Sequence, residues 1–168
     1  MGDPHKPKKT YHRPRRIWTI DQLNAELYIL GTYGLRNKRE LWKAQSEVAR
    51  IRNQARALLA VPPEFRRDKE LRLLGFLNRL GLVNESASLD DVLNLKIEDI
   101  LERRLQTIVM RKIMSKSAIQ ARQIVSHCHV SVGSRTVNLP GYIVRKDEEP
   151  NILVHQEPII PQPPPDPN

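Results

Sequence analysis

The residues best suited to metal chemistry form one short run, His127-Cys128-His129. A strand is expected here, so adjacent side chains would point to alternating faces, and only the distant His155 could complete a ligand set. We therefore predict no metal site. A ring nitrogen of His127 or His129 can instead donate to a phosphate or sugar oxygen of RNA, or the rings can fill half-buried surface.

Acid-base or nucleophilic catalysis is not indicated either. The acidic pairs Asp90-Asp91 and Glu98-Asp99 fall where helices are predicted to begin, and acids normally stabilise a helix at that end. No nucleophile is matched with a base, and no glycine-rich fingerprint for a nucleotide phosphate occurs. The sequence predicts a protein that is not an enzyme, has no cofactor and takes no small-molecule substrate.

The basic residues carry the strongest signal. The 168 residues include 28 Lys and Arg against 19 Asp and Glu, a net charge of +9. Residues 1–60 carry +8, residues 61–102 carry −3, residues 103–146 carry +9 with no acid at all, and residues 147–168 carry −5. An acid-free block of that length is typical of a surface that faces phosphates. Aromatic residues make up only 5%, which argues against recognition built mainly on base stacking.

Membrane association is disfavoured by the apolar pattern. No apolar run approaches the roughly 20 residues of a membrane span, and the first residues lack the apolar region of a secretion signal. The single cysteine, Cys128, cannot form an internal disulfide, which fits a reducing compartment. We expect a cytoplasmic protein with a nucleic-acid partner and no membrane partner.

The segments that must position these charges are mostly helical. Apolar residues at three- and four-residue spacing predict helices over residues 21–30, 38–60, 64–80, 88–95, 97–112 and 118–126. Gly31 is expected to end the first helix, and Trp18 and Trp42 are expected to anchor the N-terminal helices by packing. Ser117 begins a capping-box pattern for the last helix.

A change of period to two then predicts strands. Residues 129–132 and 135–137 flank Gly133-Ser134, a two-residue hairpin signal, and residues 142–144 and 151–155 could add further strands. The predicted fold class is α+β, mostly helical, with two helices and a few short antiparallel strands in the C-terminal part. Four segments are predicted: a basic arm (1–16), a helical scaffold (17–102), a small RNA-binding module (103–157) and a proline-rich tail (158–168).

Two functions remain open from the residues alone. One is a structural RNA-binding protein that holds a folded RNA between two positive surfaces, and the other is the RNA-binding subunit of an RNA-modifying enzyme. The arm could be a solvated tail, but its charge favours a segment that orders on phosphate. A DNA-binding regulator is disfavoured because neither dimerising heptads nor a helix-turn-helix pattern occurs.

Several stretches resemble a known family. The segments Leu95-Lys96-Ile97-Glu98-Asp99-Ile100-Leu101-Glu102-Arg103-Arg104-Leu105-Gln106-Thr107, Gln120-Ala121-Arg122-Gln123 and Pro140-Gly141-Tyr142-Ile143-Val144 are similar to the small-subunit ribosomal protein four family. Tyr33-Gly34-Leu35-Arg36-Asn37-Lys38-Arg39-Glu40-Leu41-Trp42-Lys43 resembles its archaeal and eukaryotic-cytosolic branch. The resemblance implies a protein that binds small-subunit ribosomal RNA at a helix junction and nucleates assembly of the subunit body. It also implies a place near the messenger RNA entry path, beside small-subunit ribosomal protein five, and a contribution to decoding accuracy.

The resemblance also implies RNA contacts from the module. By position these are Arg103, Arg104 and Arg122 on the helices, with Lys116, His127, His129 and Arg135 around the turns. Together with the basic residues of both positive blocks, the expected RNA-binding residues are Arg13, Arg15, Arg16, Arg36, Asn37, Lys38, Arg39, Lys43, Arg50, Arg52, Arg56, Arg103, Arg104, Arg111, Lys112, Lys116, Arg122, His127, His129 and Arg135.

Two positions depart from the family pattern. The family commonly has glycine where this chain has Ile113 and Cys128. If those positions require a positive φ, each non-glycine residue would cost about 1 kcal/mol or more. The N-terminal cysteines that bind zinc in some bacterial members are absent here, and the acidic tail points to an archaeal type.

Overall fold

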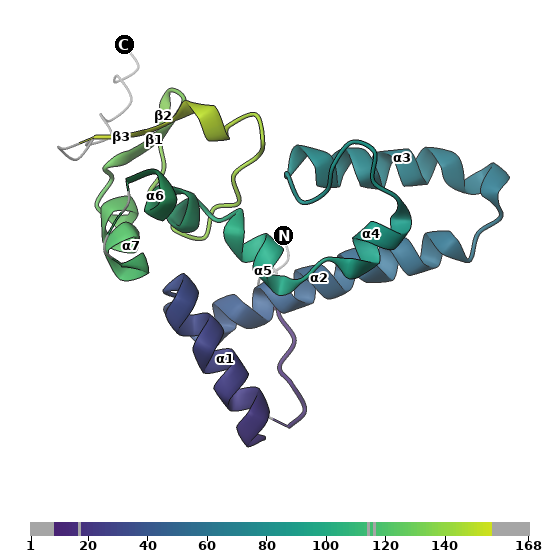
Figure 1. Ribbon diagram of the computed structural model, residues 1–168, viewed down its shortest axis with the longest axis horizontal. Coiled ribbons are helices and arrows are strands. Elements are labelled where there is room, and N and C mark those ends of the chain that lie inside the picture. The colour runs from purple at the N-terminus through teal and green to yellow at the C-terminus, as the bar shows by residue number, and fades with distance from the viewer. Residues whose placement is uncertain (1–8, 17, 114, 116, 156–168) are drawn as a thin grey trace, which may run out of the picture.

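The computed structural model describes residues 9–16, 18–113, 115 and 117–155. Its elements are α1 (Ile20–Tyr33), α2 (Lys38–Leu59), α3 (Pro63–Arg79), α4 (Leu89–Asn94), α5 (Ile97–Glu102), α6 (Leu105–Ile113), α7 (Ala118–Ser126), β1 (Val130–Val132), β2 (Arg135–Thr136), the 3₁₀ turn η1 (Glu149–Asn151) and β3 (Ile152–Val154). Figure 1 shows α2 as a long central rod, with α6, α7 and the small sheet gathered beyond one of its ends. The predicted α+β, mostly helical class is confirmed.

The scaffold is built around α2. Its apolar stripe, which includes Leu41, Val48 and Ile51, is almost fully buried. Helices α1, α3, α4 and α5 all pack against it. Asn37 begins the helix, because its side chain accepts a hydrogen bond from the backbone N–H of Glu40 at 3.2 Å. The predicted range of residues 38–60 is confirmed to within one residue.

The module has its own core. Leu105, Val109, Val125, Val130 and Val144 are each fully buried in a cluster separate from that of the scaffold. Its sheet has the order β2-β1-β3 with antiparallel pairs. The predicted two-residue hairpin is confirmed, because residues 132 and 135 pair directly across Gly133-Ser134. The last buried residue of the first cluster, Leu101, and the first buried residue of the second, Leu105, are four positions apart, and Ile143 packs against the first cluster.

Two predicted helix boundaries are wrong. The first helix passes Gly31 and ends at Gly34, whose φ of 58° allows the N–H of Leu35 to reach the carbonyl of Leu30 at 3.0 Å. An isolated glycine inside a helix costs only about 1 kcal/mol, so Gly31 does not stop it. The predicted helix over residues 97–112 is broken between α5 and α6, at Arg103 and Arg104.

The break at residues 103–104 has a tertiary cause. Arg104 forms an isolated β-bridge with Ile143, and the N–H of Leu105 donates to the carbonyl of Tyr142 at 2.8 Å. These bonds to a distant segment replace the intrahelical bonds that a continuous helix would make. The same pairing accounts for residues 142–144, where we predicted a strand and the structure has this single bridge.

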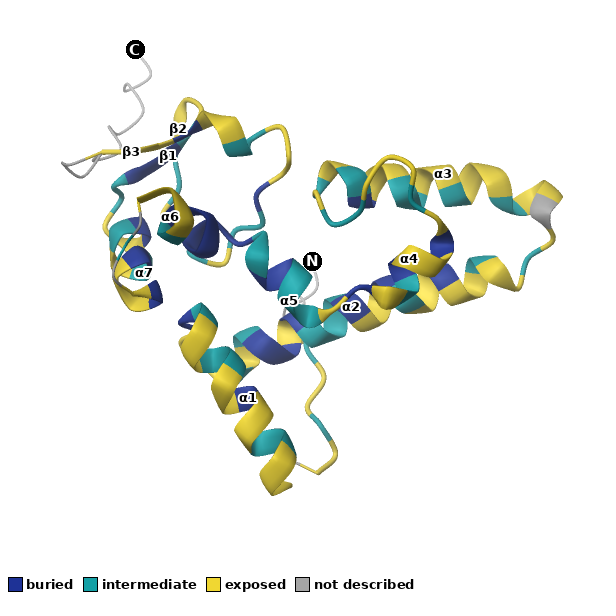
Figure 2. Cartoon of the chain, in the orientation of Figure 1, coloured by how far each residue is buried: buried dark blue, intermediate teal, exposed yellow. Residues whose placement is uncertain are grey.

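The two tryptophans lie in different environments. Trp42 is buried, donates from Nε1 to Glu26 at 3.2 Å, and stacks with Tyr11 of the arm. Trp18 is 86% exposed, so the expectation that it packs is wrong. Exposed residues cover much of α1 and α3 in Figure 2.

Backbone strain is present at one of the two suspected positions. Cys128 has a φ of 63°, whereas Ile113 is the last residue of α6 and has ordinary helical geometry. Replacing Cys128 with glycine should raise the free energy of unfolding by about 1 kcal/mol, because glycine adopts this conformation without strain. Urea denaturation measures the change. Gln123→Gly, an exposed helical control, should lower stability by roughly 0.5–1 kcal/mol, and equal effects of the two substitutions would contradict the assignment.

Candidate nucleic-acid interface

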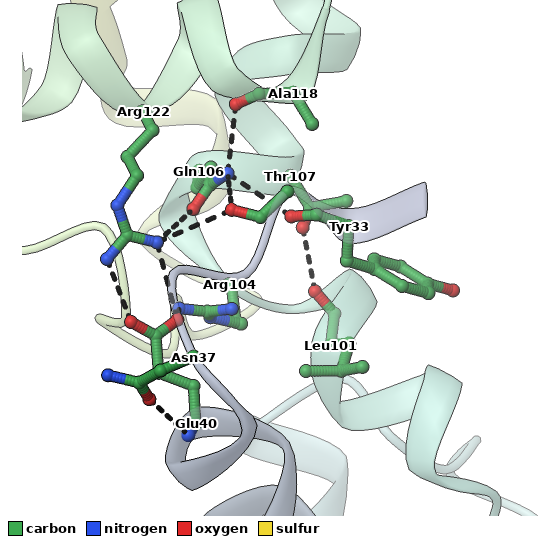
Figure 3. Close-up of polar contacts among 10 residues, drawn as sticks. Tyr33, Asn37, Glu40, Leu101, Arg104, Gln106, Thr107, Ala118 and Arg122 are labelled. Carbon is green, nitrogen blue, oxygen red and sulfur yellow. Dashed lines mark hydrogen bonds and ion pairs between the residues drawn. The ribbon is translucent and has the colours of Figure 1, made fainter. Parts of the chain in front are cut away.

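Glu40 joins the scaffold to the module. Its carboxylate accepts from Arg104 at 2.7 Å and from Arg122 at 2.8 Å, as Figure 3 shows. Burial alone would raise the pKa of Glu40, but the hydrogen bonds and charges of the two arginines outweigh it and hold the pKa below its usual value. Only 7% of the Arg104 side chain is exposed, so the carboxylate of Glu40, and not water, compensates its positive charge.

A buried amide completes this internal interface, by which we mean the contacts of residues 33–40 with α6 and α7. The Nε2 of Gln106 donates to the carbonyls of Tyr33, Gly34 and Ala118 at 2.9–3.2 Å (Figure 3). Gln106 is 1% exposed, and these bonds satisfy its donors. Glu40, Gln106 and Arg122 therefore join the two halves through paired polar groups, although Nη1 of Arg104 is buried without a hydrogen-bond partner in the described residues.

Gly34 leaves no room for a side chain at this interface. A Cβ there would lie 2.7 Å from the Cβ of Ala118 and 2.9 Å from Nε2 of Gln106. Gly34→Ala should therefore lower the free energy of unfolding by about 2–3 kcal/mol, combining strain at positive φ with overlap in the interface. Thermal unfolding measures it. The control Gly31→Ala has nothing within 4 Å of the new Cβ and lies within α1, so it should stabilise by roughly 0.5–1 kcal/mol.

Three arginines expected on the RNA surface have internal partners instead. Arg104 is buried, which corrects its expected place on the RNA surface: the guanidinium is enclosed between the two halves. Arg103 pairs with Glu149 at 2.7 Å and is 15% exposed, and Arg122 is 22% exposed. Such ion pairs form between segments distant in sequence, which local charge patterns do not reveal.

Other expected residues are also engaged within the chain. Lys38 pairs with buried Glu26 at 2.9 Å, and Arg52 donates to the carbonyl of Leu95. At the exposed surface, Arg111 pairs with Glu102, Lys112 donates to the Glu149 carbonyl, Arg50 pairs with Glu47, and Arg56 donates to Asn53. Exposed pairs like these contribute little to stability, so they can open to take a phosphate.

A smaller set of expected cations is exposed and, apart from Arg50 with its surface pair to Glu47, makes no ion pair within the part of the chain that the structure describes. Arg39 and Lys43 lie one turn apart on α2, and Arg50 follows on the same face. We call Arg39, Lys43 and Arg50 the α2 stripe. The other exposed expected cations whose side chains donate no hydrogen bond within the described residues are Arg13, Arg15, Arg16, Arg36 and Arg135. Lys116 lies outside the described residues, as do residues 1–8 of the arm and the predicted tail 158–168.

The arm and α2 line an open groove. The arm is seated by a hydrogen bond from the N–H of His12 to Ser46 at 2.9 Å, and Arg13 lies 6.0 Å over the ring of Trp42. The groove has a volume of about 650 Å³ and its lining includes the donors Lys9, His12, Arg50, Asn53 and Gln54, together with apolar surface and the carboxylate of Glu47, which pairs with Arg50. Donors of this kind, on both walls of an open groove, suit the phosphates and sugars of a nucleic-acid strand.

The histidines do not converge on a metal. The described part of the chain contains no group of three histidine, cysteine or acidic residues placed to hold an ion. His127 is exposed, whereas Nδ1 of His129 lies 3.2 Å from the carbonyl of His155. The ring of His155 in turn lies 2.9 Å from Oγ of Ser131. This contact links β1 to the end of β3, so His155 and His129 help hold the sheet together.

Sequence reasoning missed Glu40, Gln106 and Glu26. Burial would raise the pKa of Glu26, but its hydrogen bonds with Lys38, Trp42 and Gln22 lower it. One signal was available for Glu40, because it is the only acid among residues 27–46, within a run of cations. A single acid in such a run suggests an internal partner for one of the positive charges. Nothing local marked Gln106.

The chain joins a helical scaffold to a small basic α+β module, and residues 103–149 match the family model described as the S4 domain. The helices of the described residues include none long and apolar enough to cross a membrane. The class defined by the fold and the interface is therefore that of RNA-binding proteins with an S4 domain.

Three archaeal relatives extend the similarity to nearly the whole chain, and all are described as small ribosomal subunit protein uS4. That of Hyperthermus butylicus is 50% identical over 149 residues, covering 89% of this chain and 85% of the relative. That of Ignicoccus hospitalis is 52% identical over 149 residues, covering 89% of this chain and 90% of the relative. That of Nitrosopumilus maritimus is 49% identical over 162 residues, covering 96% of this chain and 81% of the relative. The chain belongs to the small ribosomal subunit protein uS4 family and is a ribosomal protein, not an enzyme.

Proposed function

We propose that this chain binds small-subunit ribosomal RNA directly, at a junction of RNA helices, through the arm, the α2 stripe and the exposed cations of the module. An RNA that contacts both the scaffold cations and the module cations gains affinity from each set. Arg36, Arg39 and Lys43 supply the scaffold side, and Arg135 and His127 supply the module side.

The observation that carries this proposal is the internal interface. Glu40 and Gln106 hold scaffold and module together through contacts between residues 64 to 82 positions apart, while nearby exposed cations remain available. A surface that is ordered before binding loses less entropy when RNA arrives. A protein of this kind can hold one arrangement of RNA helices and so begin assembly of the subunit body.

We also propose finer roles, which membership of the family favours. These are nucleation of subunit assembly, a place near the messenger RNA entry path with a contribution to decoding accuracy, and contact with small-subunit ribosomal protein five. One described surface suits a protein neighbour, because Ile20, Leu27 and Tyr28 lie exposed on one face of α1. The RNA-modifying alternative has no support from the relatives.

A sedimentation experiment tests the proposal. Labelled chain is mixed with small-subunit ribosomal RNA in the presence of excess large-subunit ribosomal RNA, and separately with small subunits in a low-magnesium gradient. We expect the chain to move with the small-subunit RNA and with the subunit. A chain that stays at the top of both gradients would refute direct binding. A chain that binds the two RNAs in proportion to their masses would refute specific binding.

A further inference from the structure

The segment of residues 61–102 has a net charge of −3, but that value combines two unlike parts. Residues 61–84 carry five basic and three acidic residues, and residues 85–102 carry one basic and six acidic residues. The helix α3 belongs to the first part, and no acid occurs from residue 71 to residue 84. The outlying helix is therefore positive, and the negative charge lies on α4 and α5.

The positive and aromatic residues of α3 share one face. Phe65, Lys69, Arg72, Phe76 and Arg79 follow each other at intervals of four, three, four and three residues, which places them along one side of a helix. We call these five residues the α3 face. All five are exposed, Phe65 at 72% and Phe76 at 40%. The face extends over about 21 Å.

The packing of α3 explains why this face is unpartnered. The opposite side contributes Leu77, which is fully buried, together with part-buried Leu73 and Leu74. Glu70 is turned toward Arg66, with which it pairs at 3.2 Å. Asp68 lies one turn before Arg72, but it forms no ion pair with the α3 face in the described residues. None of the three cations of the α3 face forms an ion pair within the described residues, and Arg79 donates only to the carbonyl of Gly75 in its own helix.

We infer that the α3 face is a further contact for ribosomal RNA, in which Lys69, Arg72 and Arg79 bind phosphates and the two phenylalanines stack on unpaired bases. This inference rests on the proposed function and extends it to a surface outside both positive blocks. Cations spaced one or two turns apart suit a phosphate backbone, and an aromatic ring among them suits an exposed base.

A protein partner fits this face less well. Lysine is depleted in the centre of protein interfaces, because burying its charge requires an acidic partner at the right place. Lys69 lies between the two phenylalanines, where the centre of such an interface would be. RNA offers a negative charge at every nucleotide, so the same residue needs no special partner.

The test compares matched charge reversals in the full chain. Arg72→Glu changes the α3 face, and Arg67→Glu makes the same change at an exposed residue on another side of the same helix. Affinity for small-subunit ribosomal RNA is measured at several salt concentrations. We expect Arg72→Glu to weaken binding about tenfold and to reduce the salt slope by roughly 0.7–0.9, whereas Arg67→Glu should stay within about twofold.

A second variant tests the aromatic part of the inference. Phe65→Ala with Phe76→Ala should weaken binding about tenfold or more with an unchanged salt slope, since stacking releases no counterion. If the wild-type chain binds small-subunit ribosomal RNA and the Arg72→Glu and Arg67→Glu variants have equal affinity for it, the inference is overturned while the proposed function stands. The inference is also overturned if the Arg72→Glu variant keeps its affinity for RNA but is no longer incorporated into assembled subunits. That result would assign the α3 face to a protein partner. If wild type does not bind this RNA, both fail.

Discussion

Glu40→Gln is expected to lower the free energy of unfolding by about 3–5 kcal/mol, because it leaves the buried guanidinium of Arg104 without a negative partner. The side chain of Arg104 is 7% exposed, so water cannot replace the carboxylate. Glutamine keeps the shape of glutamate but brings an NH₂ group that cannot accept from an arginine. Urea denaturation of the full chain measures the loss.

Glu47→Gln provides the matched control on the same helix. Glu47 pairs with Arg50 at the surface, where both side chains are more than a third exposed, so its loss should cost no more than about 0.5 kcal/mol. Equal effects of the two substitutions would contradict a structural role for the Glu40 pair.

The pH dependence of stability should identify the same group. The folded-state pKa of Glu40 is held below that of the unfolded chain, so its ion pairs stabilise the protein above the usual carboxyl pKa and lose this effect as pH falls through the folded value. Wild type should therefore lose stability on acidification more steeply than Glu40→Gln. The pKa of Glu26 is also lowered, so part of the acid sensitivity should remain in the variant.

The double reversal Arg39→Glu with Lys43→Glu is expected to weaken binding of small-subunit ribosomal RNA about 100-fold at physiological salt, because two phosphate contacts are lost and two repulsions are introduced. The two side chains are exposed on the α2 stripe, and neither makes an ion pair within the described residues, so folding should change little. Filter binding measures the affinity, and thermal unfolding confirms that the variant is folded.

The control for this reversal is Arg67→Glu with Lys96→Glu. It changes the net charge by the same amount at two exposed scaffold residues outside the α2 stripe. We expect a loss of less than about fivefold, which reflects the general field of the protein. If the control weakens binding as much as the stripe reversal, net charge and not the α2 stripe governs the affinity.

The fold was most predictable where the pattern was local and long. The apolar period of α2 is uninterrupted, so its ends were predicted to within one residue. The segment over residues 97–112 has an equally regular period, yet it is broken at Arg103 and Arg104, because those residues bond to Tyr142 and Ile143. No window of local sequence contains a contact between residues about 40 positions apart.

The site was less predictable for the same reason. A charge count locates a positive block but does not distinguish an arginine that faces solvent from one that pairs internally. Arg104 pairs with Glu40 across a sequence separation of 64 residues, and Arg122 pairs with it across 82. Block averages also concealed α3, whose positive face was combined with the acids of α4 and α5. The roles of the remaining expected RNA-binding residues stay predictions.

The salt dependence of RNA affinity tests the central claim, that this chain holds ribosomal RNA through exposed cations on a fixed frame. The measurement is the affinity of the full chain for small-subunit ribosomal RNA over a tenfold range of potassium chloride. Each neutralised phosphate contributes a slope of roughly 0.7–0.9 log units, so about five contacts predict a slope of −3.5 or steeper. An affinity that changes little with salt would contradict the account.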